Sequence, residues 1–382
     1  MSELSYLEKL LDGVKVEWKT LEKVLKRTKG TKITAGQMKA LHKDNAPLKI
    51  FAGGKTVAFV DFKDIPEKDI NREPSIIVKS RGIIEFEYYD KPFSHKNEMW
   101  SYHSNNDAIS IKYIYYFLKI NEGYFQKIGG KMQMPQIATP DTDKFEVPIP
   151  CPDNPEKSLA IQSEIVRILD KFTALTAELT AELNMRKKQY NYYRDQLLNL
   201  EGRENTREMR IGDIYDFQYG TGNTIPKSGG QYPVYGSNGI VGSHDKYNSE
   251  DSPVIGHIGA YAGIVNWGQG KHFVTYNGVI CRHKSKEVLQ KYAYYLLLLQ
   301  DFGSKSNSAS QPFVSYNILN APIVLVPPLQ EQARIVEILD KFDTLTNSIT
   351  EGLPREIELR QKQYEYYRDL LFSFPKPETV SN

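Results

Sequence analysis

Apolar residues recur at steps of three and four along two long segments of the chain, residues 158–200 and 328–372. The stripe of the first segment consists of Ile161, Ile165, Ile168, Leu169, Phe172, Leu175, Leu179 and Leu183. The stripe of the second consists of Ile335, Ile338, Leu339, Phe342, Leu345 and Ile349. This spacing predicts two amphipathic helices, and a narrow apolar stripe on a long helix needs a second helix to cover it. We therefore expect the two helices to pack together as an antiparallel coiled coil.

The ends of these helices carry recognisable signals. Ser158 is a candidate N-cap of the first helix, and Pro328 suits the first turn of the second. The second helix also contains Gly352 and Pro354, and proline is not tolerated in a helix interior. The pattern predicts a break at this point, with a new helix that starts around Pro354.

The remaining sequence has a different pattern. Short β-rich runs such as "KTVAFVDF", "SIIV", "GIIEFEYY" and "GIVNW" are separated by Gly, Asn and Ser, and short helical stretches such as "IKYIYYFLKI" interrupt them. This mixture predicts an α+β fold. The expected order is a globular domain, a helical spacer, a second globular domain and a second spacer, at residues 1–157, 158–203, 204–327 and 328–375.

The two halves of the chain repeat one another. "EIVRILDKFTALT" begins at Glu164 and "RIVEILDKFDTLT" at Arg334, 170 residues later, and each is followed by a copy of KQYxYYRD. The globular parts show fainter parallels in the same order: "LKIFAGGKT" with "YPVYGSNGI", "PSIIVKSRG" with "SPVIGHIGA", and "KMQMPQI" with "SASQPFV". The period is too long for a solenoid unit and indicates duplication of a domain with its helix. "LLDG" at Leu10 also resembles "NLEG" at Asn199, which predicts that the N-terminus lies near the end of the second long helix.

Composition narrows the class of protein. The 382 residues are 40% hydrophobic and 25% charged, which is typical of a soluble globular protein. No apolar run approaches the length of a membrane helix, and "MSELSYLEKLLDG" has no signal-peptide core, so we expect a cytoplasmic protein. Two cysteines, Cys151 and Cys281, exclude a disulfide framework and a cysteine-based zinc site.

The distribution of charge is more informative than its sum. The net charge is only +2, yet no acidic residue occurs between Lys23 and Lys43. The basic residues of this run are Lys23, Lys26, Arg27, Lys29, Lys32, Lys39 and Lys43. Such a run is consistent with an edge that contacts DNA phosphates and equally with a solvated lysine-rich surface.

Motifs of common catalytic sites are missing from the sequence. It contains no Walker A motif, no dinucleotide-binding fingerprint, no Asn/Asp-Pro-Pro-Tyr motif of adenine methyltransferases, and no HExxH or GxSxG motif. The seven histidines are scattered, so His257 and His272 are expected on the surface or in a core rather than on a metal. These observations favour a binding protein that holds no metal or cofactor of its own.

Loops rich in Gly, Asn and Gln supply further candidate contacts. "VYGSNGIVG", from Val234, places Tyr235, Ser237 and Asn238 beside glycines that allow a close approach of the backbone. Asn, Ser, Gln and Arg can read base edges, although an ordinary hairpin turn is the alternative for this stretch. The candidate DNA-contacting residues are Lys26, Arg27, Lys29, Lys32, Lys55, Lys79, Arg81, Lys131, Gln133, Gln136, Tyr219, Thr221, Asn223, Tyr235, Ser237, Asn238, His257, Ser308, Ser310 and Gln311.

The tyrosines of KQYxYYRD allow two interpretations. Either they pack within the chain, or they dock another subunit, because aromatic and Arg side chains on several faces of a helix are typical of interfaces. The candidate docking residues are Tyr190, Tyr192, Tyr193, Arg194, Tyr364, Tyr366, Tyr367 and Arg368.

In combination, "ILDKF", "YPVYGSNGIVG", "VPPLQEQARIVEILDKF" and "GLPREIELRQKQYEYYRDLL" resemble the specificity subunits of Type I restriction–modification systems. The resemblance covers essentially the whole chain and implies two target-recognition domains, each reading one half of a bipartite asymmetric DNA target. It also implies that the helices set the spacer between the halves and dock two methyltransferase subunits. Those subunits bind S-adenosylmethionine and methylate adenine, two motor-nuclease subunits can join them, and the specificity subunit itself catalyses nothing. The second helix departs from a perfect repeat by about four extra residues around Pro354.

Two other classes of protein remain open from the residues alone. One is a coiled-coil scaffold that binds no DNA, and the other is a catalytic subunit with an unrecognised site. Salt-dependent binding to mixed duplex DNA separates the first from a DNA reader. Assay of the chain alone for methyl transfer or cleavage tests the second.

Overall fold

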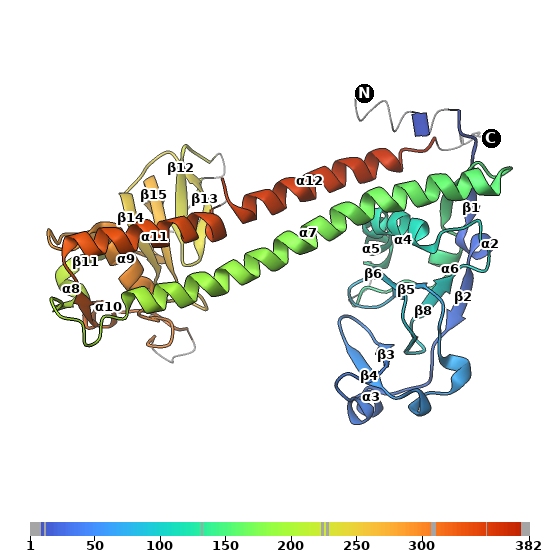
Figure 1. Ribbon diagram of the computed structural model, residues 1–382, viewed down its shortest axis with the longest axis horizontal. Helices are drawn as coiled ribbons and strands as arrows, with labels where there is room; N and C mark the ends of the chain where they lie inside the picture. The colour runs from blue at the N-terminus through green and yellow to red at the C-terminus, as the bar shows by residue number, and fades with distance from the viewer. Residues whose placement is uncertain are drawn as a thin grey trace. The chain divides into compact units, whose positions relative to one another are not determined.

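The structure is a computed structural model that describes residues 9–10, 13–130, 133–222, 225–226, 229–306, 311–348 and 350–375. The chain divides into two compact units (Figure 1). Unit 1 comprises Met1–Glu178 and Ile357–Asn382, and unit 2 comprises Leu179–Glu356. Each unit therefore contains one globular part and a piece of both long helical segments.

The globular part of unit 1 is built on a four-stranded antiparallel sheet in the order β2-β8-β5-β6. Its strands are β2 (Lys26–Lys29), β5 (Ser75–Lys79), β6 (Glu85–Tyr89) and β8 (Trp100–His103). The helices are α2 (Leu21–Val24), α4 (Ile111–Ile120), α5 (Glu122–Gly129) and α6 (Thr139–Asp143). A separate antiparallel pair, β1 (Val16–Thr20) and β9 (Glu146–Pro150), brings the two ends of the globular part together.

A second, smaller sheet extends unit 1. It contains β4 (Val57–Val60), β3 (Leu48–Phe51) and β7 (Phe93–His95) in that order, with β3 and β7 parallel. Helix α3 (Ala35–Leu41) packs on it, and Met38, Leu48, Ile50 and Val60 form a core of their own. Figure 1 shows this small sheet at the end of unit 1 away from the long helix α7 (Pro155–Leu198).

Unit 2 follows the same plan with one larger sheet, in the order β11-β16-β14-β15-β12-β13. Its strands are β11 (Tyr215–Tyr219), β12 (Tyr232–Gly236), β13 (Gly239–His244), β14 (Ser249–Gly256), β15 (Val265–Val274) and β16 (Gly278–His283). The helices of the globular part are α8 (Ile211–Ile214), α9 (Gln290–Leu298) and α10 (Tyr316–Asn320). The pair β10 (Arg207–Arg210) and β17 (Ile323–Val326) brings the ends together, as β1 and β9 do in unit 1.

The duplication predicted from the sequence is confirmed strand by strand. The first four strands of the unit 2 sheet match β2-β8-β5-β6 in order and direction. Corresponding hydrogen bonds also match: Thr31 N–H donates to the His95 carbonyl at 2.7 Å, and Thr221 N–H donates to the Val274 carbonyl at 3.1 Å. Equivalent positions in the two units can therefore be paired from contacts, although few of their side chains are alike.

The long helical segments pack as predicted. Helix α7 is continuous over 44 residues, and the second segment consists of α11 (Leu329–Asn347) and α12 (Leu353–Leu371). In unit 1 Phe172 stacks on Tyr367, with ring centroids 5.4 Å apart. In unit 2 Phe342 stacks on Tyr193 at 5.6 Å. Within each unit the paired helices run in opposite directions (Figure 1), so the antiparallel coiled-coil packing is confirmed.

The predicted break is also confirmed, but one predicted cap is wrong. Helix α12 starts at Leu353, with Pro354 in its first turn and Gly352 in the left-handed region at φ 81°. Ser158 is not an N-cap, because α7 already begins at Pro155. Asn154 caps it instead, accepting a hydrogen bond from the Lys157 N–H at 3.0 Å. The hydroxyl of Ser158 accepts a hydrogen bond from the Gln162 amide.

The first and last segments that the structure describes contact each other in unit 1, which agrees with the position predicted from the repeat. The indole N–H of Trp18 donates to the Pro375 carbonyl at 2.9 Å. Leu10 and Val14 pack against the core cluster that contains Leu371 and Phe372.

The repeated ILDKF phrase fastens each globular part to its helix. In unit 1 Asp170 accepts hydrogen bonds from the Tyr116 hydroxyl at 2.5 Å and from Lys112 at 2.7 Å. In unit 2 Asp340 accepts one from the Tyr295 hydroxyl at 2.5 Å, and Lys291 lies 3.9 Å away. One reason for repeating this phrase is therefore internal, since it joins a helix and a globular part in the same way twice.

Candidate nucleic-acid interface

In unit 1 two of the segments singled out in the sequence lie side by side. The turn between β5 and β6 contacts residues 133–137 through a bridge between Arg81 and Gln136. The Gly82 N–H donates to the Pro135 carbonyl at 2.9 Å, and Gly82 has a φ of 79°, which only glycine adopts easily. Arg81, Gln133 and Gln136 are all exposed here. We call this pair of segments the turn pair of unit 1.

Unit 2 has the same turn pair at residues 257–260 and 311–314. Ile258 bridges Phe313, and the Gly259 N–H donates to the Pro312 carbonyl at 2.8 Å. Gly259 has a φ of 89°, as Gly82 has 79° in unit 1. The two units thus share one backbone arrangement with different side chains: Arg81 and Gln136 in one correspond to Ile258 and Phe313 in the other.

The basic run supplies an exposed strand in unit 1. Lys26, Lys29 and Lys32 are exposed, and none forms an ion pair with any residue that the structure describes. Arg27 differs because its Nε lies 3.2 Å from Asp143, which neutralises part of its charge. Lys55 is exposed at the turn between β3 and β4. The three free lysines fit the phosphate-contacting interpretation better than Arg27 does.

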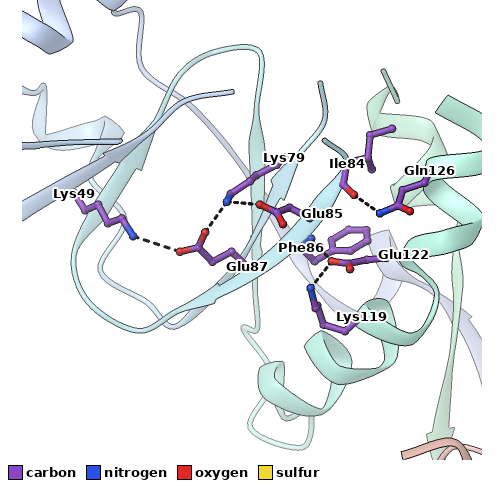
Figure 2. A network of polar contacts seen from close by, with 9 residues as sticks. All are labelled: Lys49, Lys79, Ile84, Glu85, Phe86, Glu87, Lys119, Glu122 and Gln126. Carbon is purple, nitrogen blue, oxygen red and sulfur yellow. Dashed lines mark hydrogen bonds and ion pairs between the residues drawn. The ribbon is translucent and has the colours of Figure 1, made fainter. Parts of the chain in front are cut away.

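Lys79 does not fit the predicted role. Its side chain is only 8% exposed and lies 2.6 Å from Glu85 and 2.8 Å from Glu87 (Figure 2). Glu87 also pairs with Lys49 at 3.3 Å, so the network links β5 and β6 to β3 of the small sheet. Burial alone would lower the pKa of Lys79, but hydrogen bonds to the two carboxylates outweigh it and raise that pKa. Lys79 therefore carries a neutralised charge at the base of the turn pair.

The loop beginning at Val234 is an ordinary hairpin turn. Ser237 and Asn238 form the two-residue turn between β12 and β13, where Gly236 lies opposite Gly239. Ser237 is half-buried and Asn238 exposed, so both can reach a ligand. Tyr235 cannot, because it is only 7% exposed and its hydroxyl donates to the Trp267 carbonyl at 3.3 Å.

His257 is also buried, at 4% exposure, and its Nδ1 lies 3.1 Å from the Tyr276 carbonyl. Its ring stacks on Tyr219, with centroids 4.0 Å apart. His257 therefore packs beneath Tyr219 and is not itself accessible to DNA. Thr221, which follows Tyr219 closely in sequence, and Gln311, in the turn pair of unit 2, are exposed. Lys131, Asn223, Ser308 and Ser310 lie outside the described residues.

Several exposed apolar and aromatic side chains, on the turn pair of unit 1 and close in sequence to segments of unit 2 that surround its turn pair, were not predicted from the sequence. Beside Arg81 in unit 1 these are Ile83 and Met134, 56% and 52% exposed, and the Arg81 Nε lies 3.0 Å from the Met134 sulfur. In unit 2 they are Tyr261, Tyr276 and Tyr316. Apolar residues were assigned to cores by default; aligning the fainter parallels of the two halves would have drawn attention to them.

The KQYxYYRD helices present the same exposed pair of rings in both units. Tyr192 and Tyr366 are 60% and 55% exposed, and each makes an edge contact with the next tyrosine. Arg194 and Arg368 each pair with the following aspartate, at 2.8 and 2.7 Å. Tyr193 and Tyr367 stack on the phenylalanines of ILDKF with part of each ring exposed.

Tyr190 is the exception among the predicted docking residues. It is 6% exposed, belongs to the core of unit 2, and burial raises its pKa. Its counterpart Tyr364 is half-buried against the core of unit 1. Both therefore serve chiefly internal packing, and the accessible surface centres on Tyr192 and Tyr366.

The residues that the structure describes contain no group of three or more His, Cys, Asp or Glu side chains placed to hold a metal ion. None of their helices is long and apolar enough to cross a membrane.

Comparison with known proteins identifies the family. The model of the Type I restriction modification DNA specificity domain matches twice, at residues 15–186 and 203–359. The EcoR124I/EcoR124II specificity subunit of Escherichia coli is 41% identical, over 100% of both chains. The EcoprrI specificity subunit of Escherichia coli is 37% identical over 92% of this chain and 93% of its own.

A solved structure has the same fold. The S subunit of a Type I restriction–modification system from M. genitalium matches with a TM-score of 0.67 and 18% identity, over 96% of this chain and 98% of that one. The two matches of the family model correspond to the two halves of the repeat. The chain therefore belongs to the specificity subunits of Type I restriction–modification systems.

Proposed function

We propose that each unit reads one half of a bipartite asymmetric DNA target through its turn pair. As a specificity subunit, the chain is the DNA-recognition component of its system and not the catalytic one. The observation that carries the proposal is a backbone arrangement present twice with different exposed side chains. Identical arrangements present side chains in the same way, and different side chains allow different bases to be read.

We assign the recognition domains and the spacers the boundaries predicted from the sequence. Residues 1–157 and 204–327 act as the recognition domains, and residues 158–203 and 328–375 act as spacers. Two identical methyltransferase subunits dock at the equivalent exposed tyrosines, and two motor-nuclease subunits can join the complex. The methyltransferases hold S-adenosylmethionine, and the assembly works in the cytoplasm. A repeated docking surface suits this arrangement, because identical partners on a duplex approach its two strands in opposite senses.

The test is binding of the assembled complex to mixed duplex DNA over a range of salt concentrations. Steep loss of affinity with salt is expected, because neutralised phosphates release counterions on binding. The chain alone should show no methyl transfer. A complex that assembles but binds no DNA at any salt concentration would support the alternative class, a coiled-coil scaffold that does not bind DNA.

The basic strand gives a sharper prediction. Lys26→Ala, Lys29→Ala or Lys32→Ala should weaken binding to all sequences alike and reduce the salt slope by about one unit each. Arg27→Ala should have a smaller effect because Asp143 already neutralises part of its charge. Lys157→Ala removes an exposed lysine from α7 and serves as the control. Unchanged slopes for all three lysines would place the run on a surface that does not touch DNA.

Substitution of the exposed tyrosines should weaken methyltransferase docking without lowering the stability of the chain. Tyr192→Ala and Tyr366→Ala should leave the melting temperature within about 3 °C, because surface substitutions rarely cost more than about 0.5 kcal/mol. Loss of an interface tyrosine should weaken methyltransferase binding by about 10- to 30-fold. Tyr247→Ala removes a ring that is 46% exposed elsewhere in unit 2 and is the matched control. If Tyr192→Ala strongly destabilises the chain and leaves docking unchanged, the Tyr192 ring serves internal packing and not docking.

A further inference from the structure

Three rings of unit 2 form a stack beside the turn pair. Tyr219 lies 4.0 Å from His257 and 4.1 Å from Tyr316, with interplanar angles of 20° and 12°. Two rings this close and this parallel to a third must occupy its opposite faces, because on one face they would overlap. Tyr219 is thus covered on both sides, and Tyr316 is the outer ring of the stack.

The outer ring is held in place before any ligand arrives. The Tyr219 N–H donates to the Tyr316 hydroxyl at 3.0 Å. Tyr316 is also the first residue of α10, whose N-cap Ser315 accepts a hydrogen bond from the Ile318 N–H at 3.4 Å. Although one face of its ring is covered, Tyr316 remains 37% exposed. It therefore offers a fixed, open aromatic face, and stacking on it costs little conformational entropy.

The equivalent positions of unit 1, all of which the structure describes, hold no rings. Matching hydrogen bonds pair Tyr219 with Lys29, because Gly220 and Thr221 correspond to Gly30 and Thr31. In the same way the Val314 N–H bond to the His257 carbonyl corresponds to the Ile137 N–H bond to the Ser80 carbonyl. This pairs His257 with Ser80, and Tyr316 with Thr139, the first residue of α6.

The charges of the two edge strands differ as well. Lys26 of β2 corresponds to Asp216 of β11, and Asp216 pairs with Lys284 at 2.7 Å. Lys32 corresponds to Gly222. The positions of Lys26, Lys29 and Lys32 are thus occupied in unit 2 by Asp216, Tyr219 and Gly222, none of which is cationic. The open ring of Tyr316 stacks on Tyr219, and a contact through that ring needs no charge.

The flat face of a base is the part of DNA that an aromatic face contacts best, and it becomes accessible only when the base leaves the stack or loses its partner. A methyltransferase extrudes its target adenine from the duplex, which leaves the opposite thymine unpaired. We propose that the open face of Tyr316 stacks on this unpaired thymine in the half-site read by unit 2. This inference rests on the proposed function, and it assigns unit 2 a stacking contact at the place where unit 1 has an electrostatic one.

The test uses the complete complex with its methyltransferase and duplexes already methylated in one half, so that only the other half accepts a methyl group. Tyr316→Ala should lower the methylation rate of the second half-site by roughly 5- to 150-fold, the range found for loss of a base–aromatic stack. The rate at the first half-site and the salt slope should not change, because no charge is removed. Tyr316→Phe keeps the ring and its stack on Tyr219 but loses the hydroxyl that accepts from the Tyr219 N–H, so it should retain most of the rate and stay well above Tyr316→Ala.

Permanganate, which oxidises unstacked thymines, identifies the contact. The thymine opposite the target adenine of the second half-site should be protected with wild-type protein and with Tyr316→Phe, and several-fold more reactive with Tyr316→Ala. Thr139→Ala is the control at the equivalent position of unit 1, and Tyr316→Leu replaces the alanine variant if that one fails to assemble.

Two results would overturn the inference. One is an alanine variant that methylates the second half-site like wild type, and the other is a loss of rate without any change in permanganate reactivity. A wild-type complex that methylates neither half-site would instead overturn the proposed function.

Discussion

Replacing residues 207–326 with the matching segment of another family member is expected to change one half of the methylated DNA motif and leave the other half unchanged. The structure favours such an exchange because the ends of the segment are neighbours: Arg207 lies opposite Val326 in the β10–β17 pair. A domain whose ends adjoin can be replaced without moving what surrounds it. Methylation of the original second half should fall to background, since a new set of side chains then occupies the turn pair.

The exchange must preserve the fastening between the globular part and α11. Tyr295 and Lys291 of the segment contact Asp340, and the Gln332 side chain accepts from the Leu289 N–H at 2.8 Å. A donor segment that keeps Tyr and Lys at these positions should fold onto the helix. The reciprocal exchange of residues 16–150, whose ends Val16 and Pro150 also pair, should change only the other half. A change in both halves after either exchange would mean that the units do not read independently.

The tandem tetrapeptide "TAELTAEL" in α7 predicts an equally large change in the target. Helix α7 runs without interruption through this stretch, and Leu175, Leu179 and Leu183 are all half-buried along it. Removing one unit of four keeps these leucines in register. It also shortens the helix by about 6 Å and about 400°, which is one turn and about 40° more. One DNA base pair adds about 3.4 Å and roughly 35°, so the angular steps nearly agree.

Deleting residues 180–183 should therefore preserve both half-sites and shorten the unread spacer by one base pair, or at most two. Duplicating the unit should lengthen the spacer by the same amount. The second helical segment is already interrupted before Leu353, so it is not a continuous rod that would resist the change. The measurement is adenine-methylation mapping in cells that carry each variant with its methyltransferase. An active variant that keeps the original spacer would show that this helix does not set the distance.

The apolar periodicity and the internal repeat of the sequence were enough to predict most of the fold. The three- and four-residue apolar steps located α7 and α11, and Pro354 marked the restart of α12. The order of the faint parallels matched the segments of the two turn pairs, whereas β2 was paired with β11 only through matching hydrogen bonds in the structure. The exception at Ser158 arose because Asn154 and Pro155 provide a stronger start four residues earlier.

Individual site residues were harder to predict, because burial and pairing depend on strands that are distant in sequence. Lys79 resembled a surface cation, but Glu85 and Glu87, on one face of the neighbouring strand, neutralise it. Tyr235 was assigned to a surface, and Tyr190 was a docking candidate with internal packing as the alternative. Both lie in cores, since hydroxyl groups at their ends do not prevent burial of the rings. Tyr316 was not predicted because its position is fixed by stacking on Tyr219, nearly a hundred residues away in the sequence.

A map of methylated adenines in cells that express the wild-type chain with its methyltransferase tests most directly whether two units of this protein read two half-sites. We expect one asymmetric motif of two specified halves, separated by an unread gap of constant length, with one methylated adenine in each half. We also expect the motif to disappear when the chain is deleted and the methyltransferase is retained. A continuous motif without a gap, or a motif that persists without the chain, would contradict the claim that two units of this protein read two half-sites.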